Sequence, residues 1–312
     1  MYYPYLRGKQ YELILVREGA SLISQSAIVP IIEPVKSSLS GIMRAVESLI
    51  ESECRFVVVT NPQCGELVDQ NDILKEKLFP IVEKYENFLP GYILTGEASD
   101  IDNLNEHPGS GVAVIHRGSA YGREVASLLA DLEVDVVLNI FIEGKSSSKL
   151  YQRHFKKGER ILVRDGFERK RNKDYGKQDF FSELHLTYDE EGMNGFGDFL
   201  IVGDEFSETG GPAYAIALHL TYIDDNDEER MYVKHYVSDK NHSPVDPAGK
   251  FQEALSKLVI DVNKSGSNII HTNAVKEFSD LHDKQHFPGL GYVKKLSMQH
   301  HLETIEQYLS EE

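Results

Sequence analysis

The chain has 312 residues, of which 41% are hydrophobic and 27% charged, an ordinary composition for a globular protein that can bury a large core without disulfides. Its formal net charge of −17 argues against broad nucleic-acid binding, because a phosphate backbone would be repelled. The two cysteines, Cys54 and Cys64, lie in no CxxC motif and no Cys/His cluster, which argues against a disulfide framework and a zinc knuckle.

Strand-like and helix-like segments alternate along the first two thirds of the chain. Residues 55–60 form a continuous apolar, β-branched run, which is typical of a strand buried on both faces. Residues 40–52 carry apolar side chains at helical spacing. Seven strands are predicted, at 27–33, 55–60, 91–95, 111–116, 135–142, 159–164 and 197–202. Helices are predicted at 11–22, 40–52, 72–88, 101–106, 123–132, 146–155 and 178–190.

Alternating strands and helices imply a parallel sheet, and seven repeats exceed what a small open sheet needs. We therefore predict an α/β protein with a (β/α)8 TIM-like barrel; a doubly wound open sheet is the alternative. The pattern breaks after strand seven, where residues 213–223 and 231–237 flank an acidic turn and favour a hairpin. Alternatively, residues 212–223 form a helix and 231–237 the eighth barrel strand. Either way we expect the barrel to close irregularly.

The chain is predicted to form a single domain, because no segment is rich enough in Pro, Gly or Ser to be a linker. Residues 1–26 would be an N-terminal segment with a capping helix, 27–240 the barrel, and 241–312 a helical extension. Three helices are expected in that extension, at 249–263, 273–285 and 293–309. No signal peptide and no run of 18 apolar residues is found, so we expect a cytoplasmic protein.

Nearly every predicted strand ends in a polar side chain, which is where α/β barrels carry their chemistry. Three of these side chains suit acid/base catalysis, a carboxylate pair and an imidazole that titrates near neutrality: Glu33, Asp165 and His116. Six more suit ligand binding, with the two arginines as an anion clamp: Lys36, Asn61, Arg117, Asn139, Arg164 and Asp204. In the alternative interpretation these groups pair with one another and only stabilise the rim.

Residues 203–212 form an unusual loop with three glycines and three acidic side chains. The glycines would allow backbone N–H groups to face an anion, whereas the carboxylates, together with Asp198, could bind a divalent cation. A plain structural loop is the leading interpretation. We therefore expect no cofactor, with a divalent cation at this loop as the alternative.

Basic residues are concentrated between positions 145 and 177, where twelve Lys and Arg stand against four Asp and Glu. The local charge is thus +8 in a chain of −17. A solvated loop explains this segment most simply. The functional alternatives are a site for a phosphate, an acidic partner, or a nucleic acid, the last only through residues 145–177.

Residues 3–13 read Tyr-Pro-Tyr-Leu-Arg-Gly-Lys-Gln-Tyr-Glu-Leu, and residues 29–34 read Val-Pro-Ile-Ile-Glu-Pro. These two stretches resemble the start of the phage-type "beta protein" family. Segments 195–199, 217–222, 287–291 and 296–302 resemble a bacterial branch of that family, so the resemblance covers nearly the whole chain. It implies a protein encoded in a mobile or defence-associated region beside a second gene, hence a protein partner, and it implies no catalytic residues.

Two functions remain open. The first is a component of a bacterial anti-phage or mobile-element-associated two-gene system that binds a small anionic ligand or a protein partner. The second is a stand-alone barrel enzyme, a hydrolase or lyase that acts on a phosphorylated or nucleotide-like small molecule. The resemblance favours the first, and the polar strand ends are compatible with both.

Overall fold

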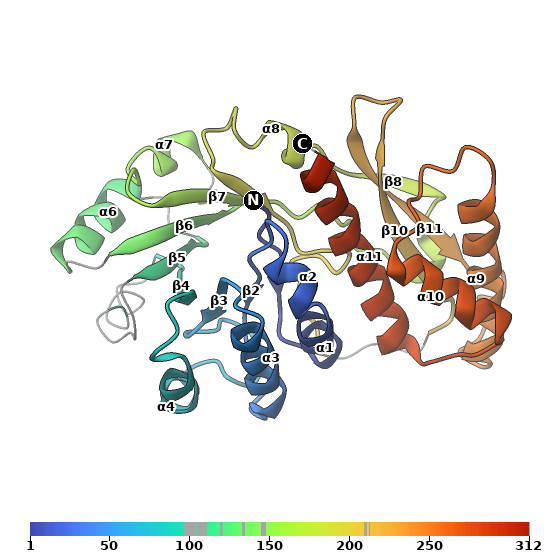
Figure 1. Ribbon diagram of the computed structural model, residues 1–312, viewed down its shortest axis with the longest axis horizontal. Helices are drawn as coiled ribbons and strands as arrows, with labels where there is room; N and C mark the ends of the chain where they lie inside the picture. The colour runs from blue at the N-terminus through green and yellow to red at the C-terminus, as the bar shows by residue number, and fades with distance from the viewer. Residues whose placement is uncertain are drawn as a thin grey trace. The chain divides into compact units, whose positions relative to one another are not determined.

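Eight parallel strands form one sheet, in the order β1-β2-β3-β4-β5-β6-β7-β9 (Figure 1). The computed structural model describes residues 1–96, 104, 111–118, 121–132, 135–144, 148–208, 211 and 213–311. The strands of this sheet are β1 (Tyr5–Leu6), β2 (Ile31–Ile32), β3 (Phe56–Val59), β4 (Phe88–Leu94), β5 (Val112–His116), β6 (Val136–Ile142), β7 (Glu159–Val163) and β9 (Gly195–Gly197).

The two edges of this sheet meet along a seam between the N-terminal segment and β9. Across it, Phe196 N donates to Met1 O at 3.2 Å, Tyr3 N to Phe196 O at 2.8 Å, and Tyr5 N to Asp198 O at 2.9 Å. In the described chain these contacts amount to one isolated bridge, Tyr2 with Phe196, and not to a continuous ladder. The sheet is therefore a nearly closed barrel with one unsealed seam, and the predicted α/β barrel class is confirmed.

The barrel interior is filled by apolar side chains. Side chains alternate between the two faces of a strand, so every second residue points inward. The inward-facing set comes from all eight strands or the residues beside them, and such a set can meet only inside a barrel. It comprises Tyr3, Tyr5, Val29, Ile31, Val57, Val59, Leu89, Ile93, Ala113, Ile115, Leu138, Ile140, Ile142, Ile161, Val163 and Phe199.

Helices follow the barrel strands in the chain. They are α1 (Gln10–Glu18), α2 (Ala20–Ser24), α3 (Ser40–Glu51), α4 (Asn71–Val82), α6 (Gly122–Asp131) and α7 (Lys149–Gln152). In α3 the buried residues Ile42, Ala45, Val46 and Leu49 lie three or four positions apart, so they share one face of the helix. The opening helix predicted at 11–22 is interrupted at Gly19, between α1 and α2.

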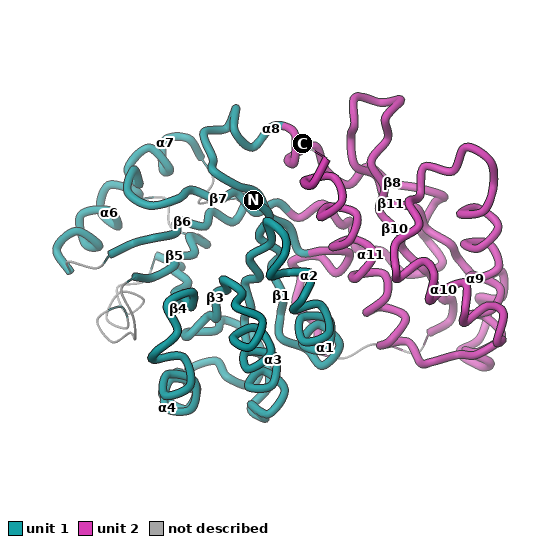
Figure 2. Tube along the Cα trace, in the orientation of Figure 1, with its two compact units in different colours: residues 1–164, 187–199 teal, residues 165–186, 200–312 magenta. Residues whose placement is uncertain are grey.

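The chain divides into two units, coloured differently in Figure 2. Unit 1, residues 1–164 and 187–199, contains the barrel. Unit 2, residues 165–186 and 200–312, contains a second sheet of order β10-β11-β8, in which all pairs are antiparallel. Its strands are β8 (Gln178–Ser182), β10 (Ala217–Asp224) and β11 (Arg230–Val237).

The helical elements of unit 2 include three long helices at the end of the chain. The elements are η2 (Asn172–Asp174), α8 (Leu184–Thr187), whose last residue falls in unit 1, α9 (Pro247–Asn263), α10 (Asn273–Asp283) and α11 (Leu290–Glu311). Leu218, Leu220 and Tyr222 of β10 pack with apolar residues of all three long helices into one core. The C-terminal helical extension is thus confirmed. No helix in the described chain combines the length and apolar character needed to cross a membrane.

The structure corrects the sequence-based prediction at three places. The eighth barrel strand is β1, at the start of the chain, so the barrel does not begin at residue 27. The alternative that residues 231–237 close the barrel is wrong, because β10 and β11 form the predicted hairpin. The helix predicted at 178–190 is confirmed only over α8, because residues 178–182 pair with β11 as strand β8.

Two other expectations have a different outcome. The helix predicted at 101–106 lies outside the described residues except for Leu104. Whether both units fold together as the single domain expected from the sequence stays a prediction.

Candidate functional site

Glu33 follows β2 directly and is fully buried in unit 1. Its Oε2 accepts hydrogen bonds from the hydroxyl of Tyr5 at 2.8 Å and from Nη1 of Arg7. Its Oε1 accepts from the backbone N–H of Gln63 at 2.8 Å and faces the thiol of Cys64 at 3.4 Å. The carboxylate is therefore held by four donors, which come from β1, from the segment after β1 and from the segment after β3.

Arg7 is the cationic partner of Glu33. It follows β1, is 5% exposed, and forms a buried ion pair with that carboxylate. Its guanidinium carbon lies 5.1 Å from the ring centroid of Tyr5 and 5.4 Å from that of Phe199, within the range of cation–π contacts. Tyr3, Tyr5 and Arg7 alternate along the segment, so Arg7 continues the inward-facing row of the barrel.

Cys64 shares this carboxylate and is a poor nucleophile. Burial and, after it, the carboxylate of Glu33 raise the pKa of its thiol to about 12, against the opposing effect of the Arg7 and Arg117 guanidinium groups. The same two arginines oppose the rise in the pKa of Tyr5, which comes mainly from burial and then from Glu33. Because thiolates and not thiols attack, Cys64 is not poised for catalysis.

Arg117 therefore acts on the same groups as Arg7, from another strand. It follows β5 directly and is half-buried. In the sheet order, β5 stands four strands from β1, so the two strands lie across the barrel from each other. Ile115 belongs to the inward-facing set, and alternation points Arg117 inward too. The two arginines thus converge on Glu33 and Cys64 at the carboxyl end of the barrel.

Asn61 and Lys36, both predicted ligand-binding residues, are engaged in local contacts. The side chain of Asn61 donates to Ile93 O at 2.9 Å and accepts from Ile93 N at 2.8 Å, which extends the pairing of β3 with β4. Lys36 is solvent-exposed and pairs with Glu66 at 2.7 Å. Asn61 thus stabilises the carboxyl end of the barrel, which we call the mouth, and Lys36 lies on its solvent-exposed rim.

His116 and Asn139 lie together, but on the outside of the barrel. Nε2 of His116 is 3.0 Å from Oδ1 of Asn139, and Nδ1 is 2.9 Å from the hydroxyl of Tyr151 in α7. The imidazole stacks on Phe141, with ring centroids 4.6 Å apart. Burial lowers the pKa of His116 to about 4, and the bond to Asn139 opposes this. The expectation that these two side chains line the mouth is wrong, because alternation along β5 and β6 turns them outward.

Arg164, the second arginine of the predicted anion clamp, is held by carboxylates of unit 1. Its Nε donates to both carboxylate oxygens of Glu143, at 2.9 and 3.0 Å. Its Nη2 lies 3.3 Å from Oε1 of Glu191. These contacts with two acidic partners fix Arg164 at the end of β7.

Asp165 and Asp204 are brought together in unit 2. The carboxylate of Asp165 accepts the backbone N–H of Phe167 at 3.1 Å and that of Asp204 at 2.8 Å. This is a typical way for an aspartate to organise a loop. The pairing of Asp165 with Glu33 as two catalytic carboxylates stays a prediction, since the residues belong to different units.

Sequence reasoning missed Arg7, Tyr5 and Cys64. Residues 1–26 were assigned to a capping segment, so no strand end was sought there. The usable signal is the alternation Tyr3, Tyr5, Arg7, in which two aromatic side chains and then a cation share one face of an extended segment. Cys64 carries no comparable signal, because its role depends on a loop packed against Glu33.

A metal site is not apparent in the described residues, where no group of three or more His, Cys, Asp and Glu side chains is arranged to hold an ion. Asp198, a predicted cation ligand, accepts the hydroxyl of Tyr2 at 2.7 Å. Comparisons with protein-family models, curated proteins and solved structures find no match to this chain. The function must therefore be argued from the site.

Proposed function

We propose that this chain is the ligand-binding component of a bacterial two-gene system, and that its ligand is a small anion held at the carboxyl end of the barrel. The observation that carries the proposal is the convergence of Arg7 and Arg117 on one buried carboxylate. Both guanidinium groups act on the side chains that contact Glu33, within a strongly acidic chain.

The arrangement at the carboxyl end of the barrel favours ligand binding. It does not favour catalysis by Glu33, His116 or Cys64. Glu33 is saturated by its four donors, so it has no lone pair aimed at a substrate. His116 lies outside the barrel, and the pKa of Cys64 is raised by burial. A prearranged cation beside a rigid carboxylate is what recognition of an anion requires, because little reorganisation accompanies binding. The stand-alone hydrolase or lyase remains the alternative.

Thermal-shift measurements on the full chain test the anion site. The probes are inorganic phosphate, pyrophosphate, a sugar phosphate and a nucleoside monophosphate, each at constant ionic strength. We expect at least one probe to raise the melting temperature of the wild type, because a ligand that binds only the folded state stabilises it. The Arg117→Gln variant should lose that increase.

The matched control is Arg123→Gln, which removes an exposed arginine from α6 and should keep the increase. An equal response of both variants would show that the anions act through general charge effects. A wild type that responds to no probe would count against the anionic ligand.

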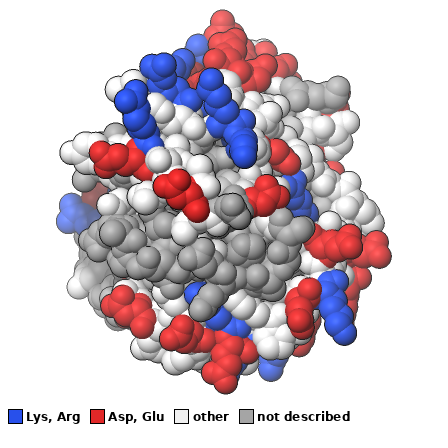
Figure 3. Space-filling view, turned by 90° about the vertical axis from the view of Figure 1, so that its left-hand side faces the viewer, with Lys and Arg blue, Asp and Glu red and all other residues white. Residues whose placement is uncertain are grey.

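The biological part of the proposal rests on the resemblance described above and on a basic surface in unit 1. Lys and Arg side chains gather in the upper part of the face shown in Figure 3, on the side that carries α7. Lys149, Arg153, Lys156 and Lys157, in α7 or shortly after it, are exposed, and Leu150 of α7 is 69% exposed. A cluster of cations around an exposed apolar side chain suits an acidic protein partner.

Co-purification with the product of the neighbouring gene tests the partner. We expect the wild type to form a complex that dissociates as the salt concentration is raised. The double variant Lys149→Glu, Arg153→Glu should not form this complex. Deletion of the gene should raise phage plaque counts. This part of the proposal would be wrong if the chain does not bind the product of the neighbouring gene and if deletion of its gene leaves plaque counts unchanged. That outcome would not affect the proposed anion site.

A further inference from the structure

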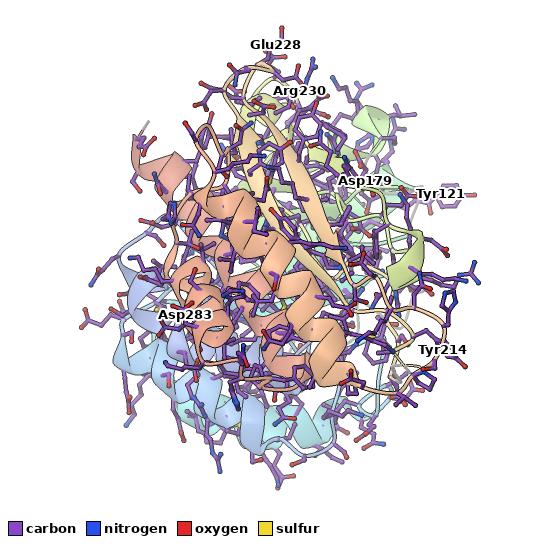
Figure 4. The ribbon with its side chains drawn as sticks, turned by 90° about the vertical axis from the view of Figure 1, so that its right-hand side faces the viewer. Tyr121, Asp179, Tyr214, Glu228, Arg230 and Asp283 are labelled. Carbon is purple, nitrogen blue, oxygen red and sulfur yellow. The ribbon has the colours of Figure 1, made fainter. Side chains whose placement is uncertain are left out.

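Two histidines of unit 2 face each other across neighbouring strands. His219 of β10 and His235 of β11 are directly paired in the antiparallel register. Their Nδ1 atoms lie 2.7 Å apart, a hydrogen-bonding distance. On the far side of His235, Nε2 lies 3.1 Å from Oδ2 of Asp179, a residue of β8 that is labelled in Figure 4. Three adjacent strands thus supply a continuous chain, Asp179–His235–His219.

The contacts determine where the protons lie in this chain. A carboxylate only accepts hydrogen bonds, so Nε2 of His235 carries a proton and donates it to Asp179. In the neutral imidazole, Nδ1 of His235 is then an acceptor, and the proton in the short contact must sit on Nδ1 of His219. It follows that Nε2 of His219 carries a lone pair and no proton.

The side chain that carries this lone pair is not fully enclosed. His219 is only half-buried, whereas His235 is 6% exposed. Within the described part of the chain, Nε2 of His219 makes no hydrogen bond. The ring is held from the sides by Phe167 and Tyr175, with centroids at 5.1 and 4.8 Å. The orientation of the imidazole is thus fixed by aromatic contacts and by the hydrogen bond at Nδ1.

Charged groups surround the chain on several elements. Lys170 bridges Asp179, at 2.9 Å, and Glu168, at 2.8 Å. Burial lowers the pKa of His235, and the carboxylate of Asp179 opposes this. Burial, together with His235 and Lys294 of α11, lowers the pKa of His219 to about 3, and the carboxylate of Asp179 opposes this. The hydroxyl of Tyr175 accepts the backbone N–H of Lys170. The imidazole pair is therefore neutral at neutral pH, with its one carboxylate partner at the His235 end.

We propose that Asp179, His235 and His219 form a proton relay, and that Nε2 of His219 is a general base for a ligand that presents a hydroxyl group or a water molecule. This site lies in unit 2 and does not depend on the anion site of unit 1. The arrangement parallels the use of a carboxylate to orient an imidazole and to stabilise its charged form.

The proton transfer balances along the chain. The O–H bond of the ligand breaks, its oxygen keeps the electron pair, and an N–H bond forms at Nε2 of His219. The proton on Nδ1 of His219 passes to Nδ1 of His235. His219 is then neutral again, and His235 is an imidazolium paired with the carboxylate of Asp179. The relay places the positive charge beside its counter-ion instead of leaving it on His219.

Two-bond ¹H–¹⁵N correlation spectra of the full chain, labelled with [¹⁵N]histidine, test the proton positions at pH 7.5. We expect His219 to carry its proton on Nδ1 and His235 to carry it on Nε2. The His219→Asn and His235→Asn variants assign the two signals. A proton found on Nε2 of His219 at this pH would overturn the proposal, because that nitrogen could then accept none.

Reaction with diethyl pyrocarbonate tests the reactivity of the same nitrogen. The lone pair at Nε2 forms a bond to one carbonyl carbon, and the bond from that carbon to the bridging oxygen breaks. The ethyl carbonate that leaves takes up the proton lost from the ring and decomposes to carbon dioxide and ethanol. His242, His271 and His286 are exposed and serve as internal standards in peptide mass spectrometry. We expect His219 to react at least as fast as these standards despite its partial burial.

The Asp179→Asn variant isolates the contribution of the relay. It should slow modification of His219 roughly tenfold and leave the three standards unchanged, since loss of an orienting carboxylate removes much of an imidazole's reactivity. A Phe180→Ala variant changes an exposed side chain on the same strand and controls for disturbance of β8. Equal rates in wild type and Asp179→Asn would show that no relay operates.

Discussion

Glu33 is the residue on which the barrel mouth depends most. Its charge lies out of contact with solvent, and the ion pair with Arg7 and three further donors compensate for its lost hydration. Removing one member of a buried ion pair is far more damaging than replacing both, because the remaining charge keeps its desolvation penalty.

Glu33→Gln should therefore lower the free energy of unfolding by about 3–5 kcal/mol, the usual effect of leaving one buried charge without its partner. Urea titration followed by circular dichroism measures this. The double variant Arg7→Met, Glu33→Leu, which removes both charges, should be the more stable of the two. A double variant less stable than Glu33→Gln would mean that the hydrogen bonds of Glu33, and not its charge, hold the mouth together.

Cys64 gives a second prediction at the scale of single residues. Since burial and Glu33 raise the pKa of its thiol to about 12, alkylation by iodoacetamide at pH 8 should run roughly a hundredfold or more slower than that of free cysteine. Quantitative mass spectrometry of the modified peptide measures the rate. Unfolding in urea should restore the ordinary rate, and a fast reaction in the folded chain would contradict the described environment.

At the scale of elements, the seam is the most demanding contact of the barrel. Gly197 of β9 lies so close to the N-terminal segment that a Cβ atom there would overlap the carbonyl oxygen of Tyr3. The neighbouring backbone hydrogen bonds from Tyr3 to Phe196 and from Tyr5 to Asp198 require this close approach. A glycine in a short strand, usually unfavourable, is here what allows the first strand and the last strand to meet.

Gly197→Val should accordingly destabilise the chain by about 1–3 kcal/mol, the range typical of overpacked sites. Thermal unfolding of the purified variant measures the loss. Gly176→Ala is the matched control, because a Cβ at Gly176 would have no neighbour within 4 Å. If both variants have the melting temperature of the wild type, the seam can widen at little cost in free energy, and it does not contribute to barrel stability.

The elements also show which parts of the fold the sequence could predict. Continuous apolar runs such as residues 56–59 identify strands buried on both faces, and six of the seven predicted runs contain a barrel strand or part of one. The seventh prediction, 197–202, is displaced, because β9 spans Gly195–Gly197 and shares only Gly197 with it. β1 was not predicted because only Tyr5 and Leu6 pair regularly with β2, and a strand of two residues shows no periodicity in the sequence. Residues 178–182 were assigned to a helix because aromatic and apolar residues there also fit helical spacing; their pairing with β11 is a tertiary contact that no local pattern reveals.

The candidate site was predictable to a similar degree. Glu33 and Arg117 lie at strand ends and point inward, as expected for the mouth of a barrel. His116 and Asn139 were misplaced because a residue at or near a strand end can face either side, and a shift of one position reverses the side chain. The relay of His219, His235 and Asp179 needed the register of three strands, which the sequence does not contain.

For the whole molecule, the histidines buried as neutral groups link stability to pH. Burial lowers the pKa of His116 to about 4, and burial likewise lowers that of His300 to about 4. His300 of α11 is fixed by Thr221 O at Nε2 and by the Thr272 hydroxyl at Nδ1, both at 2.8 Å. In the unfolded chain both groups take up protons near pH 6.5. Between pH 6.5 and 4 the unfolded state therefore binds more protons than the folded state, and stability falls as pH falls.

For each of these histidines, the free energy of unfolding should fall by up to about 1.4 kcal/mol for every pH unit by which the pH is lowered between 6.5 and 4. The net charge of −17 acts in the opposite direction, since approach to the isoelectric point near 5.2 relieves self-repulsion. Urea titrations at pH 7.5, 6.5, 5.5 and 4.5 in 0.5 M NaCl separate the two effects, because salt screens exposed charges and leaves buried imidazoles unaffected. The loss should be smaller in His116→Gln. A free energy of unfolding that stays constant from pH 7.5 to 4.5 would mean that these imidazoles become charged without leaving the folded state.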